Sequence, residues 1–227
     1  MRRRGYFITG TDTGVGKTRV AAALCHAFAA RKLRVAAMKP LASGCAHGAQ
    51  GLRNEDAERL LAAMNVGAAY ADVNPYAFAP AIAPHIAARQ AGVHIEQAVL
   101  HRSFERLALQ SEVMIVEGAG GWLAPLDEQR TFADLAQGWE LEVILVVGMR
   151  LGCLNHALLT QDSMRHRDAR FAGWVANHIE PDMPVAEENL ATLRARLGAP
   201  CLGRLPFAPS ETPAASAARL AVELLSG

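Results

Sequence analysis

Cysteine is sparse in this sequence, and its spacing is uninformative for metal binding. The four cysteines, Cys25, Cys45, Cys153 and Cys201, are scattered, and no two of them form a C-x-x-C pair. This spacing gives no basis for a zinc site or a disulfide framework, and it favours a protein of the reducing cytoplasm. We expect most of these thiols to be small buried side chains.

Long apolar runs and an excess of charge are also missing. The best apolar run, residues 143–147, is far shorter than the roughly 20 residues that a membrane-spanning helix needs. The 23 basic and 22 acidic side chains give a formal net charge of +1. Both observations argue against a membrane protein and against a nucleic-acid binder with a strong basic field. With 51% apolar residues, the 227 residues are expected to fold as a single domain over 1–227.

Lysine is scarce among the basic residues. Only Lys17, Lys32 and Lys39 are lysines among the 23 basic side chains, and the others are arginines. Such a bias toward arginine and alanine is typical of drift in genome composition. A lysine that persists against this drift is a candidate for chemistry that arginine cannot perform.

Short apolar runs alternate with helical stretches along the chain. The predicted strands are 6–9, 34–38, 113–116, 143–147 and 174–176, and the predicted helices are 18–31, 54–64, 94–110, 131–137, 154–165 and 185–196. This alternation indicates an α/β fold with a mostly parallel central sheet and helices on both faces, and the motif described next makes it P-loop NTPase-like. The segments 41–53 and 68–84 contain glycine, serine or proline and are predicted to be mostly loop.

The strongest motif lies between the first predicted strand and the first predicted helix. Residues 10–18 read G-T-D-T-G-V-G-K-T, and their end matches a phosphate-binding loop. Backbone N–H groups around Gly14 and Gly16 are suited to cradle phosphate oxygens, together with the positive end of the helix. Lys17 is then expected to reach the β- and γ-phosphates, and the Thr18 hydroxyl to bind Mg²⁺. The motif departs from the usual spacing in its first glycine, which comes one residue early.

An apolar strand that ends in an acid follows about a hundred residues later. Residues 113–116 are apolar, Glu117 comes next, and a glycine-rich stretch follows at 118–121. In P-loop proteins an acid in this place faces the magnesium ion of the nucleotide, and aspartate is its usual form. Asp56 could add a second carboxylate, although its position alone fits a solvated helix start better.

Two more polar residues follow predicted strands. Lys39 ends the second strand, where a second cation would stabilise charge during phosphoryl transfer; an exposed strand-end lysine is the alternative. Asn177 follows the strand at 174–176, and an asparagine in this place of a P-loop fold commonly hydrogen-bonds the nucleotide base. Because no N-K-x-D guanine signature accompanies it, adenine is favoured over guanine.

With these residues in place, the chain resembles the dethiobiotin synthetase family over nearly its whole length. The resemblance rests on several stretches together: 10–18, K-P-L-A-S-G at 39–44, G-L-R-N-E-D-A at 51–57, 73–76, 84–85, E-G-A-G-G-W within 116–122, 151–157 and 172–177. It implies an ATP- and Mg²⁺-dependent cyclo-ligase that joins 7,8-diaminopelargonic acid (7,8-diaminononanoate) and CO₂ and releases dethiobiotin, ADP and phosphate. A carbamate and then a carbamic–phosphoric anhydride are the implied intermediates.

The resemblance also implies a role for each site residue. Lys17 and Lys39 are the implied catalytic residues, and Thr18, Asp56 and Glu117 the implied Mg²⁺ ligands. The implied nucleotide contacts are Gly14, Val15, Gly16, Lys17, Thr18, Arg19, Asp56, Glu117, Gly118, Ala119, Gly120, Asn177, His178, Pro206, Phe207 and Ala208. The implied substrate contacts are Thr13, Ser43, Gly152, Cys153 and Asn155.

The resemblance further implies a homodimer with its active site at the subunit interface. The substrate's carboxylate would meet the helix N-terminus at 152–155 of the partner subunit; a plain strand-to-helix turn is the alternative. The chain departs from some relatives at Gly14, where they have glutamate, and at Asn189, where they have tyrosine. Glu211 is the candidate for a family acid that contacts ribose or adenine.

Two other functions compete with this interpretation. A nucleotide-switch ATPase of the partition or division-site type shares the fold class, but Asp12 stands here in place of its signature lysine. A cobalamin-pathway amide synthetase shares the early motifs, but it needs a glutaminase with a Cys–His pair that the sequence does not support. We therefore expect small-molecule partners, without nucleic acid or membrane, in the cytoplasm.

Overall fold

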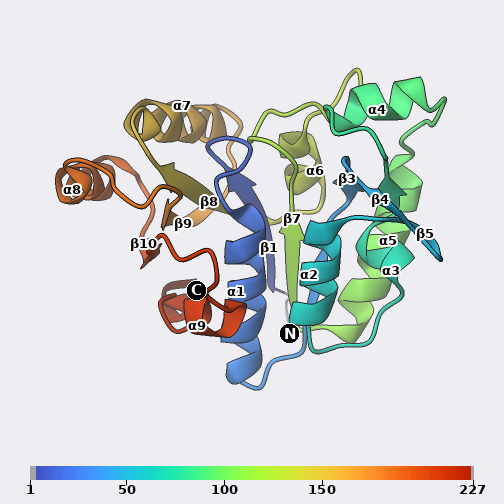
Figure 1. The fold of residues 1–227 in the computed structure, drawn as a ribbon, viewed down its shortest axis with the longest axis horizontal. Coiled ribbons are helices and arrows are strands. Elements are labelled where there is room, and N and C mark those ends of the chain that lie inside the picture. The colour runs from blue at the N-terminus through green and yellow to red at the C-terminus, as the bar shows by residue number, and fades with distance from the viewer. Residues whose placement is uncertain (1–3, 226–227) are drawn as a thin grey trace.

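A computed structural model describes residues 4–225 around a six-stranded sheet with the order β10-β9-β8-β1-β7-β2 (Figure 1). All neighbouring strands in this sheet are parallel, so the predicted fold class is confirmed. The strands are β1 (Arg4–Gly10), β2 (Val35–Met38), β7 (Val113–Glu117), β8 (Glu142–Met149), β9 (Phe171–His178) and β10 (Cys201–Leu205). The inner strands are buried on both faces, which explains why they are continuous apolar runs instead of alternating ones.

Helices cover both faces of the sheet. α1 (Lys17–Ala30) crosses in front of the strands in Figure 1, and α2 (Glu55–Ala63) and α9 (Pro213–Ala217) pack against it. The crossovers that follow β2 are α5 (Gln97–Gln110), α6 (Phe132–Gly138), α7 (Cys153–His166) and α8 (Ala186–Arg196). Because parallel crossovers are right-handed and the chain reverses direction across the sheet at β2, these four helices lie on the face opposite α1.

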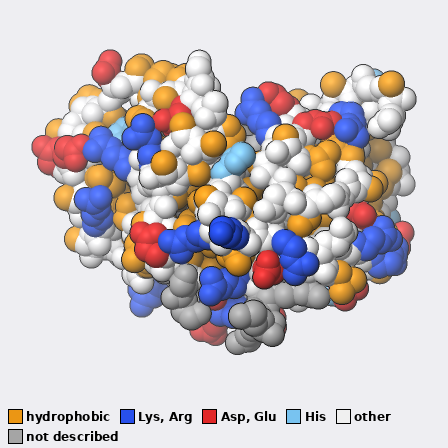
Figure 2. Space-filling model, turned by 90° about the horizontal axis from the view of Figure 1, so that it is seen from below, with side chains coloured by type: hydrophobic (Ala, Val, Ile, Leu, Met, Phe, Trp, Pro, Cys, Tyr) orange, Lys and Arg blue, Asp and Glu red, His pale blue; other side chains and the backbone are white. Residues whose placement is uncertain are grey.

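The end of the molecule at the amino ends of the strands carries mixed charge. Figure 2 shows this end from below, where Lys and Arg side chains are interspersed with Asp and Glu. Exposed ion pairs such as Arg34–Glu112 (3.4 Å) and Arg31–Glu223 (3.1 Å) belong to this mixture. Within residues 4–225, no helix is both long and apolar enough to cross a bilayer.

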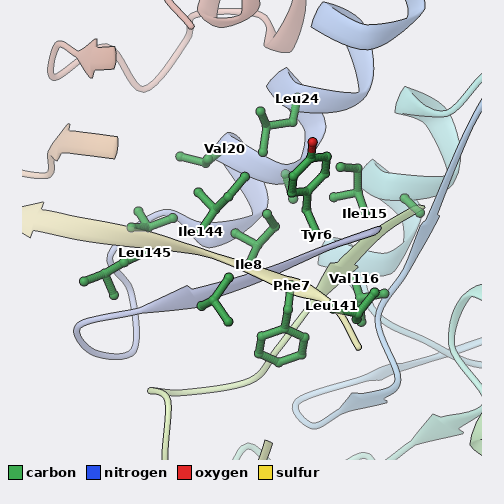
Figure 3. Packing of buried hydrophobic residues seen from close by; sticks show 14 of the residues in the cluster. Tyr6, Phe7, Ile8, Val20, Leu24, Ile115, Val116, Leu141, Ile144 and Leu145 are labelled. Atoms are coloured by element: carbon green, nitrogen blue, oxygen red, sulfur yellow. The ribbon is translucent and has the colours of Figure 1, made fainter. Parts of the chain in front are cut away.

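The core begins at β1, whose side chains alternate between the two faces (Figure 3). Tyr6 and Ile8 point toward α1, where Val20 and Leu24 meet them, and Phe7 points to the other face. The ring of Tyr6 stacks on Phe28 at 5.6 Å, and its hydroxyl donates to the carbonyl of Leu225 at 2.8 Å. Phe7 lies 6.4 Å from the ring of Phe132 in α6, which places α6 behind the sheet. β1 is therefore the strand that joins the two halves of the core.

Helix starts follow the sequence signals closely. Asn54 caps α2 as predicted, because its side chain accepts from the N–H of Ala57 at 3.2 Å. Thr131 and Asp134 form a capping box at the start of α6. α5 begins at Gln97, three residues later than the predicted start.

The two predicted loops contain short elements, so the loop prediction is wrong in part. They hold β3 (Leu41–Ala42), β4 (Ala46–Gly48), β5 (Gly51–Arg53), α3 (Tyr70–Val73), β6 (Tyr76–Ala77) and the start of α4 (Pro84–Gln90). β3 pairs with β6, and β4 pairs with β5, in separate two-stranded sheets. Strands of two or three residues are too short to show a period, so only their pairing partners reveal them.

Three elements near the C-terminus also escape the sequence patterns: β10, α9 and a 3₁₀ helix, η1 (Val222–Leu225). β10 is an edge strand of mixed burial, interrupted by Gly203 and the exposed Arg204, and it lacks the continuous apolar run of the inner strands. α9 does carry recognisable signals, because Thr212 caps it and Pro213 occupies its first turn.

Truncating the core side chain of Leu24 should destabilise the fold. Leu24 is fully buried between α1 and the sheet, so Leu24→Ala removes apolar contacts and leaves a cavity. We expect the free energy of unfolding in urea to fall by about 2–5 kcal/mol. Leu109→Ala is the matched control, since Leu109 is 69% exposed on α5, and it should change stability by less than about 0.5 kcal/mol. Equal effects of the two variants would contradict the assigned core.

Candidate active site

The carboxyl ends of β1, β2 and β7 lie at one edge of the sheet, and the segments that follow them line a cavity of about 810 Å³. Crevices outside the carboxyl ends of parallel strands are the usual ligand sites of such folds. The predicted site residues that line this cavity are Thr13, Gly14, Gly16, Lys17, Thr18, Arg19, Lys39, Ser43, Asp56, Glu117, Ala119 and Gly120. The structure thus brings together residues from four distant parts of the chain.

The loop between β1 and α1 has the backbone geometry of a phosphate cradle. Gly14 and Gly16 have φ angles of 75° and 88°, in the left-handed region that favours glycine. Gly16 is also the N-cap of α1, and a Cβ there would lie 2.2 Å from Nδ2 of Asn177. The same Nδ2 donates to the carbonyl of Val15 at 2.8 Å. Any side chain at Gly16 would therefore push the loop away from β9.

Lys17 is mostly buried, and its ammonium donates to the carbonyl of Asp12 at 3.0 Å. Burial, and after it the nearby Lys39, lower the pKa of Lys17 to about 8 against the opposing pull of Glu117 and Asp56. A group with this pKa loses much of its charge just above neutral pH. An anion held in the loop would restore that charge.

A buried cluster of ionic groups joins β2, β7 and the P-loop. The Lys39 ammonium donates to Oε1 of Glu117 at 2.5 Å, to Oδ2 of Asp56 at 3.2 Å and to the carbonyl of Gly118 at 3.2 Å. The Thr18 hydroxyl donates to the same Oε1 of Glu117 at 2.9 Å. Lys39 is 4% exposed and Glu117 is 1% exposed, so this pair is shielded from water. The Lys39 ammonium thus lies between two carboxyl groups, that of Glu117 buried and that of Asp56 partly exposed.

The pKa values in this cluster follow from burial and from the paired charges. Burial acts to lower the pKa of Lys39, but the carboxylates of Glu117 and Asp56 outweigh it and raise this pKa. Burial acts to raise the pKa of Asp56, but Lys39 outweighs it and lowers this pKa. Burial, with the nearby Asp56 carboxylate, raises the pKa of Glu117 against Lys39. Lys39 therefore stays charged at neutral pH.

The donor set at this cluster fits a magnesium ion. Oε2 of Glu117 is buried and has no hydrogen-bond partner among residues 4–225. Thr18, Asp56 and Glu117 offer a hydroxyl and carboxylate oxygens, the hard ligands that Mg²⁺ prefers when waters and phosphates complete its shell. Over the same residues, no group of three or more His, Cys, Asp or Glu side chains is arranged to hold a metal by itself. The site therefore suits an ion that arrives with a nucleotide.

A second polar network lies where the loop meets β9 and β10. Arg19 donates to Oδ1 of Asn177 at 3.0 Å, to the carbonyl of Pro206 at 2.8 Å and to Glu211 at 2.6 Å. Phe207, next along the chain, is 42% exposed. Phe207 and Ala208 follow Pro206 in the chain, and neither lines the cavity described above.

His178, in the predicted nucleotide set, lies at the end of β9. Its Nε2 accepts from Nε of Arg204 at 2.9 Å, and burial together with Arg204 lowers the pKa of the ring. The hydrogen bond from Arg204 therefore occupies Nε2 of the His178 ring.

The predicted contacts for the substrate's carboxylate lie at the start of α7. Gly152 is the N-cap of this helix with φ of 93°, Cys153 is 2% exposed, and Asn155 follows in the first turn. None of these three lines the cavity of the described chain. Leu151, immediately before them, is 98% exposed.

Two residues that position the site, Asn74 and Arg150, are not identified by the sequence patterns, and a third, Asp12, lies within the loop motif. Asn74 is buried and donates to the carbonyl of Lys39 at 2.7 Å, which fixes the end of β2. Asp12 accepts from Lys17 through its carbonyl, and its carboxylate pairs with Arg150 at 2.5 Å. Asp12 was recognisable inside the loop motif, whereas Asn74 and Arg150 carry no local signal because their contacts span distant segments.

The parallel sheet, the G-K-T loop after β1 and the acid at the end of β7 define a P-loop nucleotide-binding protein. In agreement, residues 4–215 match a family described as an AAA domain. The chain is 55% identical to "ATP-dependent dethiobiotin synthetase BioD" of Pseudomonas aeruginosa strain UCBPP-PA14 over 216 residues, 95% of each protein. It is 50% identical to the protein of the same name from Nitrosospira multiformis over 90% of this chain and 88% of that one. The chain belongs to the dethiobiotin synthetase family.

A likeness to a solved structure concerns the fold alone. The ParA family ATPase from Chlorobium tepidum TLS superposes with a TM-score of 0.59 at 14% identity, over 99% of this chain and 100% of that one. It shares the arrangement of strands and helices, and at this identity it says nothing about a common activity.

Nucleotide binding should take up protons near pH 8. The triphosphate favours the charged form of Lys17, so its pKa rises from about 8 on binding. Calorimetric titration with ATP at pH 8, in two buffers of different ionisation enthalpy, should show uptake of up to about half a proton. Affinity should also weaken as the pH rises above 8. An affinity that is constant from pH 7 to 9, without proton uptake, would contradict this role of Lys17.

Proposed function

We propose that this chain is an ATP-dependent cyclo-ligase that converts 7,8-diaminopelargonic acid and CO₂ to dethiobiotin, with ADP and phosphate as the other products. The name of relatives that are 55% identical over 95% of the chain supports this reaction. The observation that carries it is the Lys39 cluster, which sets a buried cation and two carboxylates in the same cavity as the P-loop.

The proposed reaction needs charge neutralisation more than covalent catalysis. One amine of the diamine attacks CO₂ and loses a proton, which gives a carbamate. A carbamate oxygen attacks the γ-phosphorus, ADP leaves, and a carbamic–phosphoric anhydride forms. The second amine then attacks the carbamoyl carbon, the ureido ring closes, and phosphate leaves with that oxygen. Negative charge gathers around the transferred phosphoryl group in each late step, where fixed cations stabilise it.

The two buried lysines match these charges. Lys17, at the helix start, is placed for the β- and γ-phosphates, and Lys39, at the end of β2, for the carbamate and the transferred phosphoryl group. All three N–H groups of the Lys39 ammonium already donate hydrogen bonds, so an incoming anion has to replace one of the present acceptors. Asp56 is the candidate, because its side chain is 39% exposed and its bond is longer than that of Glu117.

Magnesium is part of this proposal. Thr18, Asp56 and Glu117 would hold the ion beside the phosphates, and bound there it would add positive charge to the site. Removal of Mg²⁺ should then abolish turnover. Thr13 and Ser43 line the same cavity and are proposed to contact the diamine or the carbamate.

We also propose a homodimer. Gly152, Cys153 and Asn155 lie outside the cavity of their own chain, yet the N-terminus of α7 is suited to an anion. A partner subunit that presents this helix would bring it to the carboxylate of the diamine. The neighbouring Leu151 is 98% exposed in the single chain, which fits burial by a partner. The proposal also includes a single domain, a cytoplasmic location and no nucleic-acid partners.

The reaction is tested directly by ADP release. The protein is incubated with Mg²⁺-ATP and bicarbonate, with and without the diamine, and the product is analysed by mass spectrometry. We expect ADP release that requires the diamine and a product with the mass of dethiobiotin. Diamine-independent hydrolysis by folded protein would instead support the switch-ATPase alternative.

Replacing Lys39 should remove catalysis while the fold survives. Lys39→Met keeps the side-chain volume, and Glu117, whose pKa is already raised by burial, can take up a proton. We expect turnover to fall by about 100–1,000-fold, as for removal of one charge-stabilising donor. The matched control is Lys32→Met, since Lys32 is exposed in the turn after α1 and should keep normal turnover. Near-normal turnover of Lys39→Met would show that Lys39 has another role.

A further inference from the structure

Arg19 is the centre of the network where the P-loop meets β9 and β10. It follows Thr18 in the first turn of α1 and lines the cavity. One terminal nitrogen donates to both Oδ1 of Asn177 and the carbonyl of Pro206, at 3.0 and 2.8 Å. The other donates to Glu211 at 2.6 Å, and Nε donates to the hydroxyl of Ser216 at 3.1 Å. A single guanidinium thus links the P-loop helix to three later segments of the chain.

The acid in this network is also fully engaged. Glu211 accepts from Arg19 and from Ser216, at 2.6 and 2.7 Å, through one oxygen, and from Arg219 through the other at 3.1 and 3.2 Å. The Ser216 hydroxyl and the two arginines lower the pKa of Glu211, so it stays ionised. Its carboxylate therefore secures Arg19 and does not present a free oxygen to a ribose.

The two sides of the P-loop offer different surroundings to the base of a nucleotide. On the β7 and β2 side, the buried cluster of Lys39, Glu117 and Asp56 occupies the edge of the sheet. On the other side, Asn177 contacts the P-loop through Val15 and leads to Pro206 and the half-exposed Phe207. A base on this second side would lie beside Arg19, with the half-exposed ring of Phe207 next to Pro206 in the chain.

We propose that Arg19 makes the base site of this chain tolerant of the group at position 6 of a purine. Side-chain and main-chain oxygens of Asn177 and Pro206 are the acceptors on this side that would read a 6-amino group, and Arg19 donates to both. A site rejects an analogue strongly only when the analogue leaves its buried polar groups unpaired. Here the oxygens of Asn177 and Pro206 keep their hydrogen bonds from Arg19, whichever purine is bound. This inference rests on the proposed use of a nucleoside triphosphate.

The test compares ATP with inosine triphosphate, which has an oxygen in place of the 6-amino group and the same ribose and triphosphate. Dissociation constants of both Mg²⁺ complexes are measured calorimetrically for the unaltered chain, Arg19→Met and Arg31→Met. Loss of phosphate or helix contacts changes both constants equally, so their ratio reports the base alone. Arg31→Met is the matched control, because Arg31 caps the far end of α1 in an exposed pair with Glu223.

For the unaltered chain and for Arg31→Met, we expect the two constants to agree within about tenfold. In Arg19→Met the oxygens of Asn177 and Pro206 become free, and the preference for ATP should rise by about tenfold or more. A preference for ATP above about a hundredfold in the unaltered chain would overturn this inference. This comparison does not depend on the folding of any variant. An unchanged ratio in folded Arg19→Met would also overturn it. Absence of binding by both nucleotides would instead overturn the proposed function.

Discussion

The ion pair between Lys39 and Glu117 is the interaction on which the site depends. It places two opposite charges, each less than 5% exposed, at the ends of adjacent strands. Desolvating two charges is costly, and the cost is offset only when both stay paired and hydrogen-bonded. Thr18, Asp56 and Gly118 supply the remaining bonds. The pair also fixes how the end of β2 meets the end of β7.

The order of the strands explains why such a cluster forms at all. β1 lies between β7 and β8, so the P-loop emerges at the centre of the sheet with ionic groups on one side and β9 on the other. Gly16 allows the loop to approach β9 within hydrogen-bond distance of Asn177. The proposed phosphate site, the two buried lysines and the Arg19 network all depend on that one arrangement.

Sequence patterns predict the parts of this protein that are contiguous and long. The strand–loop–helix around Lys17 and the buried runs of β7 and β8 are visible from local composition. The approach of Lys39 to Glu117, 78 residues apart, follows because both end parallel strands at one edge. The bonds of Asn74 to Lys39 and of Arg19 to Pro206 do not follow, because irregular connections decide them. β10 and the paired segments within 41–53 are missed for the same reason: their stability comes from tertiary partners.

The central claim is that a carbamate oxygen, and not water, receives the γ-phosphoryl group in this cavity. It is tested by supplying ¹⁸O-labelled bicarbonate in unlabelled water and analysing the released phosphate by mass spectrometry before the label exchanges with solvent. The account predicts one labelled oxygen in each phosphate formed together with dethiobiotin. Unlabelled phosphate released at the same rate would show that water attacks the nucleotide, and it would contradict the account.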